Sequence, residues 1–278
     1  MPNLVTVVGR NTHILPHMLK HYEDKVDKSF VVVYRQSEDD KILEEIEELG
    51  ITPHKVVTEP KFNWERVTDL YNTVKEEKPN DWWIVSDDDE LQVYPEDLED
   101  IIKHCEKHSY DFVTGGFLDR IGTNGTFPKV DRDTNLHKTF PLGGFFRYPL
   151  SGACPNKVTL MKGYQKVTPG QHYAKFKIGN SWGTNHPKRM PVQECFTQVH
   201  HFKWDSTVLE RLLEVAETKK DYSYYAEYNK MYRAIARNDW KIDIENKEFL
   251  VEELKNNSYL IYNDYPHWVD LTNKIIKI

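Results

Sequence analysis

The segment Trp82–Val85 limits the fold more than any other part of this chain, because it holds four apolar residues in a row. Successive side chains of a strand point to opposite faces, so a strand of this kind needs apolar cover on both sides. Such cover is typical of a central strand in a sheet that is packed between helices. The segment therefore predicts a buried central strand.

Segments of strand length alternate with segments of helical spacing through about the first 120 residues. The strand-like segments are 4–8, 30–34 and 52–57, and the helix-like segments are 15–22, 41–49 and 64–78, the last of which ends before Pro79. This alternation predicts an α/β fold with a Rossmann-like, mostly parallel sheet that carries helices on both faces.

The rest of the chain has a different pattern. Residues 119–205 are poor in helical periodicity and rich in Gly, Pro and aromatic residues, which predicts short strands and long loops. From residue 206 onward, apolar residues recur at helical spacing again. We predict three parts, at residues 1–118, 119–205 and 206–278.

Composition excludes several classes of protein. With 39% hydrophobic residues in 278, the chain can bury a sizeable core, and no run of about 18 apolar residues predicts a membrane span. The N-terminus lacks the basic segment of a secretory signal, so a cytoplasmic location is expected. Three cysteines without a Cys-x-x-Cys pair fit a reducing compartment and disfavour a structural zinc site or a disulfide framework.

Charge is unevenly distributed along the chain. Residues 134–193 contain no Asp or Glu and nine Lys or Arg, which leaves −16 for the remainder of a chain whose net charge is −7. This basic segment predicts a region that faces phosphates or another anionic ligand, although chance surface composition is the alternative.

Four acidic residues, Asp87–Glu90, follow the apolar segment almost directly. Ligands of open α/β sheets bind at the carboxyl ends of strands, so these carboxylates are placed for chemistry. In an extended chain Asp87 and Asp89 would share one side and converge on one Mn²⁺ or Mg²⁺ ion. The alternative is that the acids only flank the next helix. Four crowded carboxylates repel one another without a cation, which favours the metal site.

Several segments, in order, resemble glycosyltransferases with the GT-A fold, especially the family 2-like group. The resemblance covers residues 3–212 and depends on Leu4 to Asn11, Ser37 to Asp40, the Asp-x-Asp-Glu strand end, Asp119-Arg120, Phe140-Pro141, Gly170 to Tyr173 and Val199 to Trp204. It implies transfer of a sugar from a nucleoside-diphosphate sugar, expected to be a UDP-sugar, to a hydroxyl acceptor, with inversion.

The resemblance also implies roles for single residues. Residues 1–118 would form the donor half and residues 119–205 the acceptor half. The basic segment 134–193 permits an anionic acceptor, and it suits neutralising the donor diphosphate equally well. Asp89 would bind the metal ion, Asp87 would lie near the donor ribose and the metal, and Asp39 would lie near the nucleoside. The other donor-binding residues would be Thr6, Arg10, Asn11 and Asp88.

A pair of histidines provides a further candidate ligand. A strand points His200 and His201 to opposite faces, so only one of them can face the metal ion. The family's His-aromatic pattern matches His201-Phe202, which implies that His201 is the ligand. The alternative from the residues alone is that both are packing histidines with backbone partners.

An inverting transfer needs a general base on the acceptor hydroxyl. The candidates are Glu194, the first carboxylate after the acid-free segment, then Asp119, then His172 in its Gly-Gln-His-Tyr turn. Asp119 could instead pair with Arg120, and His172 could be an ordinary loop residue. A retaining enzyme would need no such base.

Two other classes compete with the glycosyltransferase hypothesis. A nucleotidyltransferase would use similar acids, but it needs a Gly-rich phosphate loop after the first strand, where this chain has only Gly9. A non-catalytic carbohydrate-binding protein would explain the many aromatic residues but not the clustered acids. Cation-dependent binding of UDP-sugars would favour the transferase.

Overall fold

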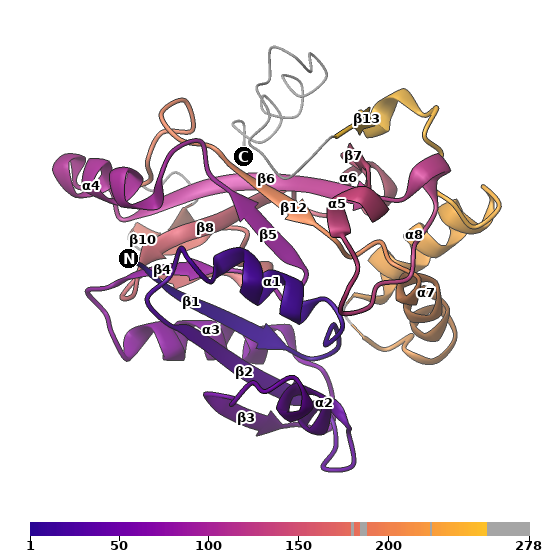
Figure 1. Cartoon of the computed structure of the whole chain (residues 1–278), viewed down its shortest axis with the longest axis horizontal. Helices are drawn as coiled ribbons and strands as arrows, with labels where there is room; N and C mark the ends of the chain where they lie inside the picture. Colours follow the sequence, from indigo (N-terminus) through magenta and orange to yellow (C-terminus); the bar gives the residue numbers. More distant parts are fainter. Residues whose placement is uncertain (179–180, 184–187, 223, 255–278) are drawn as a thin grey trace. The chain divides into compact units, whose positions relative to one another are not determined.

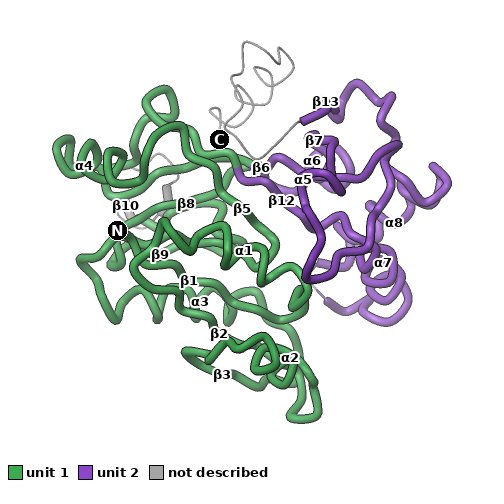
Figure 2. The backbone as a smooth tube through the Cα atoms, viewed as in Figure 1, with its two compact units in different colours: residues 1–116, 156–198, 278 green, residues 117–155, 199–277 purple. Residues whose placement is uncertain are grey.

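The computed structural model describes residues 1–178, 181–183, 188–222 and 224–254, and the chain separates into two compact units (Figure 2). Unit 1 comprises residues 1–116 and 156–198, and unit 2 comprises residues 117–155 and 199–277. Both stretches of unit 1 are needed to complete its sheet. The predicted three-part functional division into 1–118, 119–205 and 206–278 stays a prediction.

Unit 1 contains four parallel strands, in the order β4-β1-β2-β3. Their bounds are β1 (Asn3–Val8), β2 (Ser29–Arg35), β3 (Lys55–Thr58) and β4 (Trp82–Val85). Strand β3 starts three residues later than the sequence predicts, because Pro53 has no N–H group for the ladder. All four residues of β4 are buried, which confirms the predicted central strand.

Beyond β4 the sheet becomes antiparallel. Strand β8 (Asn156–Lys162) pairs with β4 on one side and with β6 (Phe112–Ile121) on the other, so that Met161 lies opposite both Trp83 and Phe112. Strands β5 (Glu90–Val93) and β12 (Thr197–His201) pair with each other, and β12 also pairs with β6. A small second sheet contains β9 (Lys166–Val167), β10 (Ala174–Ile178) and β11 (Ser181–Gly183).

Gly115 allows β6 and β12 to approach closely. A Cβ atom at this position would lie 1.9 Å from the carbonyl oxygen of Thr197. No side chain can be accommodated at that distance, so the close approach requires glycine.

Helices cover the parallel strands in unit 1. Figure 1 shows α1 (Leu15–Tyr22) and α2 (Ile42–Glu48) in front of the strands and α3 (Trp64–Glu76) behind them, and α4 (Leu98–His108) follows β5. Leu70, Tyr71 and Val74 of α3 share a buried cluster with Val5 and Val7 of β1. The predicted α/β class, with a parallel strand set between helices, is confirmed.

Unit 2 contains the distal half of β6, which pairs with β7 (Leu142–Gly144), and β13 (Glu252–Glu253), which pairs with β7. Its helices are α5 (Leu136–Thr139), α6 (Arg147–Ser151), α7 (Thr207–Thr218) and α8 (Tyr225–Ala236). Helices α7 and α8 pack through Val208, Leu212, Met231 and Ile235 around Trp204. The predicted C-terminal helices are confirmed, and residues 255–278 lie outside the described residues.

No helix in the described ranges has the length and apolar character needed to cross a membrane.

Short 3₁₀ turns mark three places where the chain changes direction. They are η1 (Thr123–Gly125), η2 (Pro169–Gln171) and η3 (Lys247–Phe249). Of these, η2 leads directly into His172, so it fixes where that predicted site residue lies.

His21 makes the stability of unit 1 depend on pH. Its Nε2 donates to the carbonyl of Gln92 over 2.8 Å, and burial lowers the pKa of its imidazole from 6.5 to about 4. The unfolded chain therefore binds more protons than the folded chain between these values, and stability falls as pH drops through this window. We expect His21→Gln to remove about 2 kcal/mol of this acid-induced loss. Urea unfolding at pH 7.5 and pH 5 measures the difference, with His17→Gln on the same helix as the matched control.

Candidate active site

The four acidic residues form a turn between β4 and β5. The N–H of Glu90 donates to the carbonyl of Asp87 over 3.2 Å, and Ser86 Oγ donates to the carbonyl of Glu90 over 3.0 Å. The alternation expected of an extended chain therefore does not apply to Asp87 and Asp89. The turn instead gives each carboxylate its own set of partners.

Asn11 connects the end of β1 to this turn. Its Nδ2 donates to Asp88 Oδ1 over 2.7 Å and to Asp89 Oδ2 over 3.2 Å, and its side chain is buried. The contact follows from the fold, because parallel neighbours β1 and β4 end at the same edge of the sheet. Asn11, Asp88 and Asp89, three of the predicted site residues, thus lie together, while Arg10 is exposed in the same loop.

Lys157 of β8 is the cation that neutralises the turn. Its side chain is 1% exposed, and its Nζ lies 2.9 Å from Asp87 Oδ2, 2.8 Å from Glu90 Oε1 and 2.6 Å from Gln171 Oε1. The sequence analysis did not identify this residue. The only local signal is a lysine inside an apolar strand pattern, and its carboxylate partners lie about 70 residues away in the sequence.

The pKa values of Asp87 and Glu90 are shifted in opposite directions. Burial opposes ionisation of Asp87, but Lys157, together with the hydroxyl of Tyr71 at 2.8 Å, lowers its pKa to about 2. Burial and the neighbouring charges of Asp87 and Asp89 raise the pKa of Glu90 to about 8, despite the contact with Lys157. Both oxygens of Asp87 are held by protein donors, whereas the ionisation of Glu90 is opposed and would be favoured by a cation beside it.

In unit 2, His201 is held by a buried carboxylate. Its Nδ1 lies 2.8 Å from Oδ1 of Asp119, a residue with no solvent exposure. Asp119 also accepts from Trp204 Nε1 over 2.9 Å and from the backbone N–H groups of Phe146 and Arg147. Burial opposes ionisation of Asp119, but these donors, His201 first, lower its pKa. The carboxylate fixes the proton on Nδ1 and leaves Nε2 as a ligand atom.

His200 has a different environment from its neighbour. Its Nδ1 accepts from Arg120 Nη1 over 2.9 Å, and Arg120 also donates to the carbonyl of Phe140. The hydrogen-bond partners of Asp119 and Arg120 are thus different groups, and these two residues form no pair with each other. The His200–Arg120 contact is a packing contact of buried polar groups.

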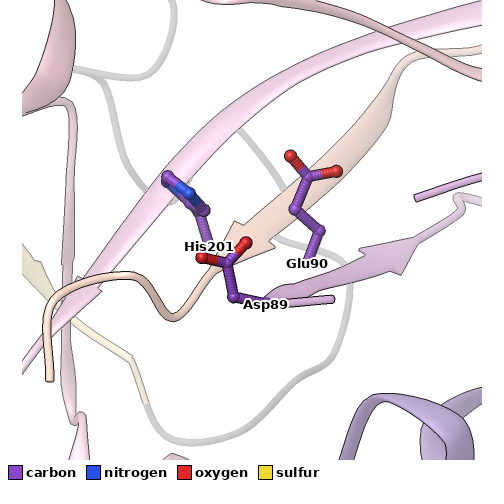
Figure 3. Close-up of side chains that lie close together, drawn as sticks. All are labelled: Asp89, Glu90 and His201. Carbon is purple, nitrogen blue, oxygen red and sulfur yellow. The ribbon is translucent and has the colours of Figure 1, made fainter. Parts of the chain in front are cut away.

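Asp89, Glu90 and His201 form a candidate metal centre (Figure 3). One ligand atom of each lies within 4.8 Å of the others, and all three side chains are buried. Carboxylate oxygens select hard divalent cations such as Mn²⁺ and Mg²⁺, and the imidazole nitrogen favours the transition metal of the two. Glu90 was not among the predicted ligands, and Asp87, which was, does not belong to this group.

The other predicted residues lie at various places in unit 1. Thr6 is fully buried in β1, and its Oγ1 has no hydrogen-bond partner within the described ranges. Asp39 is exposed after β2. His172 Nδ1 lies 2.8 Å from the carbonyl of Asn156, so His172 is tied to the strand that carries Lys157. Its neighbour Gln171 contacts Lys157 directly, which brings the His172 turn to the edge of the acidic turn.

Glu194 lies in a surface group next to α4. Its Oε2 is 2.7 Å from His104 Nε2, and its Oε1 accepts from the hydroxyl of Tyr110 over 3.3 Å. The side chains of Glu194 and His104 are each more than one-third exposed. Both carboxylate oxygens are thus occupied by partners from this group.

We expect Glu194→Gln to leave the sugar transfer predicted from the sequence within about twofold of the wild type, because exposed ion pairs contribute at most about 1 kcal/mol to stability. The melting temperature should fall slightly, as the contact with His104 weakens. Transfer rate and melting temperature are measured on the same preparation, with His104→Gln as the matched control. A loss of about 100-fold in transfer at unchanged donor affinity would instead make Glu194 the general base.

Comparisons with known proteins give only weak likenesses. No family model and no curated protein sequence matches. The solved structures with some likeness include S. aureus TarS, at 12% identity and TM-score 0.31 over 99% of this chain and 48% of that one. The 1–349 fragment of S. aureus TarS has 14% identity and TM-score 0.31 over 100% and 80%. A 4-diphosphocytidyl-2C-methyl-D-erythritol synthase has 12% identity and TM-score 0.30 over 59% and 76%.

Proposed function

We propose that this protein is a cation-dependent glycosyltransferase that moves a sugar from a nucleoside-diphosphate sugar to a hydroxyl acceptor. The observation that carries the proposal is the buried group of Asp89, Glu90 and His201, in which Asp119 fixes the proton of His201 on Nδ1. The acidic members follow the carboxyl end of a parallel strand, where α/β sheets bind nucleotides. A carboxylate behind a ligating histidine is a common support of metal centres.

Asp89, Glu90 and His201 would hold Mn²⁺ or Mg²⁺, and when bound the cation would neutralise charge on the leaving diphosphate. Asn11 orients the carboxylates of Asp88 and Asp89 through its amide. Lys157 forms ion pairs with Asp87 and Glu90 and so offsets part of the negative charge of the four acidic residues.

The donor would bind along the loops that follow β1, β2 and β4. In this proposal Thr6, Arg10 and Asp39 contact the nucleoside or its phosphates, and Asp87 and Asp88 lie at the ribose. The orphan hydroxyl of Thr6 supports a role for β1, because a buried hydroxyl without a partner is costly unless something else satisfies it. A UDP-sugar is the proposed donor.

His172 is the general base that the contacts favour for an inverting transfer. The carbonyl of Asn156 can only accept, so His172 carries its proton on Nδ1 and offers Nε2 to an acceptor hydroxyl. Asp119 already accepts four hydrogen bonds, and Glu194 is engaged with His104 and Tyr110. An anionic acceptor remains compatible with the basic segment 134–193.

The test of the function is a donor panel. Purified protein is incubated with UDP-, GDP- and dTDP-sugars, with Mn²⁺ or with a chelator, and release of the nucleoside diphosphate is measured. We expect release from one donor class only, and only with the cation. Formation of a sugar nucleotide and pyrophosphate from a nucleoside triphosphate and a sugar phosphate would overturn the proposal in favour of a nucleotidyltransferase. Cation-independent or absent nucleotide binding would favour a non-catalytic protein.

His201 and His200 provide a matched pair of variants. We expect His201→Ala to weaken Mn²⁺-dependent UDP binding by about 10- to 100-fold, because it removes a ligand of the cation. His200→Ala should leave this affinity nearly unchanged and lower the melting temperature, since it leaves the Arg120 guanidinium with one acceptor fewer. Calorimetric titration with UDP and Mn²⁺ measures both, and equal affinities in the two variants would remove His201 from the metal centre.

A further inference from the structure

Three cationic side chains of unit 2 act electrostatically on the phenol of Tyr228. Lys203 follows β12, Arg211 comes from α7 and Arg147 begins α6, while Tyr228 itself belongs to α8. We call these four residues the Tyr228 cluster. None of them belongs to the candidate metal centre.

Lys203 is the most confined of the three cations. The residue is 5% exposed, and its Nζ lies 3.4 Å from the hydroxyl of Tyr228 and 4.7 Å from the centre of its ring. Within the described ranges, no carboxylate lies within 4.0 Å of this ammonium group. Burying a charge costs several kcal/mol unless an opposite charge compensates it, so the position favours an anion that the chain itself does not supply.

The remaining charges of the cluster do not balance Lys203. Arg147 Nε is paired with Glu227 Oε1 at 3.2 Å, and its guanidinium also lies over the ring of Phe117. Arg211 Nη2 donates to Thr207 Oγ1 over 3.4 Å. Three positive groups and one negative group thus act on the Tyr228 hydroxyl.

The pKa of Tyr228 reflects the electrostatic effect of these charged groups. Burial alone would raise the pKa of a phenol, yet Lys203, Arg211 and Arg147 lower that of Tyr228 to about 8 despite Glu227. An oxyanion in place of the phenolate would be stabilised by the same groups.

We propose that the Tyr228 cluster binds a phosphate group. Two guanidinium groups and one ammonium group are the set of donors that recognises phosphate, since arginine can bind two oxygens at once and lysine adds a point charge. Tyr228 and Arg211 are partly exposed, so a phosphate group can reach them from solvent. The site stands on unit 2 alone and does not require the metal centre of the proposed function.

Inorganic phosphate is the probe for the first experiment. Calorimetric titration of the full chain at low ionic strength should show saturable binding, and Lys203→Met and Arg211→Gln should each weaken it by about tenfold or more. Lys230→Met, an exposed lysine on α8, is the matched control and should leave the affinity unchanged. Circular dichroism and melting temperature identify a variant that fails to fold, in which case the other variant decides.

A second measurement follows Tyr228 itself. The phenolate absorbance that is lost in Tyr228→Phe gives the titration of this residue, and bound phosphate should shift that titration to higher pH. Repeating the phosphate titration with UDP and Mn²⁺ present identifies the molecule that carries the group. Competition assigns the phosphate to the donor, and independent binding assigns it to an acceptor. Absence of saturable phosphate binding, or equal binding in both cluster variants and the wild type, overturns the proposal.

Discussion

Asp89→Asn is expected to lower cation-dependent sugar transfer by about 100-fold or more, because a bound metal ion contributes several kcal/mol of charge stabilisation. The substitution keeps the shape of the side chain and one oxygen that can still accept from Asn11. The protein should therefore stay folded while its affinity for Mn²⁺ falls. Transfer rate at saturating donor and Mn²⁺ affinity are the two measurements.

Asp24→Asn is the matched control for this variant. Asp24 is a highly exposed aspartate that pairs with Lys25, so the same chemical change there should leave transfer unchanged. Wild-type transfer in a folded Asp89→Asn protein would remove Asp89 from the metal centre. Unfolding of the variant would show instead that the contact with Asn11 needs the charge, and Asn11→Ala would then be the variant to measure.

Lys157→Met is expected to reduce the free energy of unfolding by about 3–5 kcal/mol, because it leaves the paired carboxylates of a buried site without their cation. Asp87 would then lose its counter-ion, and Glu90 would be left without an opposite charge at the end of β4. Urea unfolding in the presence of a chelator measures the loss. Added Mn²⁺ should recover part of it, since a cation in the metal centre would replace some of the missing charge.

Two further variants sharpen this prediction. Adding Glu90→Gln to Lys157→Met removes the most buried carboxylate and should restore about half of the lost stability. Lys162→Met is the control on the same strand, where the partner Glu106 is exposed and the contribution is at most about 1 kcal/mol. Equal losses in the two lysine variants would show that Lys157 is an ordinary ion pair and that the acidic turn does not depend on it.

The fold could be predicted largely because its signals are local. The apolar run Trp82–Val85 predicts a strand covered on both faces, and the spacing of apolar residues in 64–78 predicts the helix that covers one of them. The ends of elements were less well predicted. Pro53 delays the start of β3, and β5 was missed because it follows the acidic residues within one turn.

The site could be predicted only in part, because its partners are distant in the sequence. The four consecutive acidic residues are evident in the sequence, and they predict a bound cation. Which of them lie together depends on the geometry of the turn, which brings Glu90 rather than Asp87 close to Asp89. The sequence around Lys157 and around Tyr71 gives no indication of their roles. They become partners of Asp87 only when β8 and α3 pack beside β4.

The position of β8 in the sheet bears on how the chain is made. Strand β8 lies between β4 and β6, yet it is synthesised some forty residues after β6 and seventy after β4. A nascent chain that ends before residue 156 therefore exposes the edges of β4 and β6 that β8 later covers, and β4 is apolar. On the ribosome such a chain would be a ready substrate for a holding chaperone, and protection of its backbone amides would rise in one step once residue 162 has emerged.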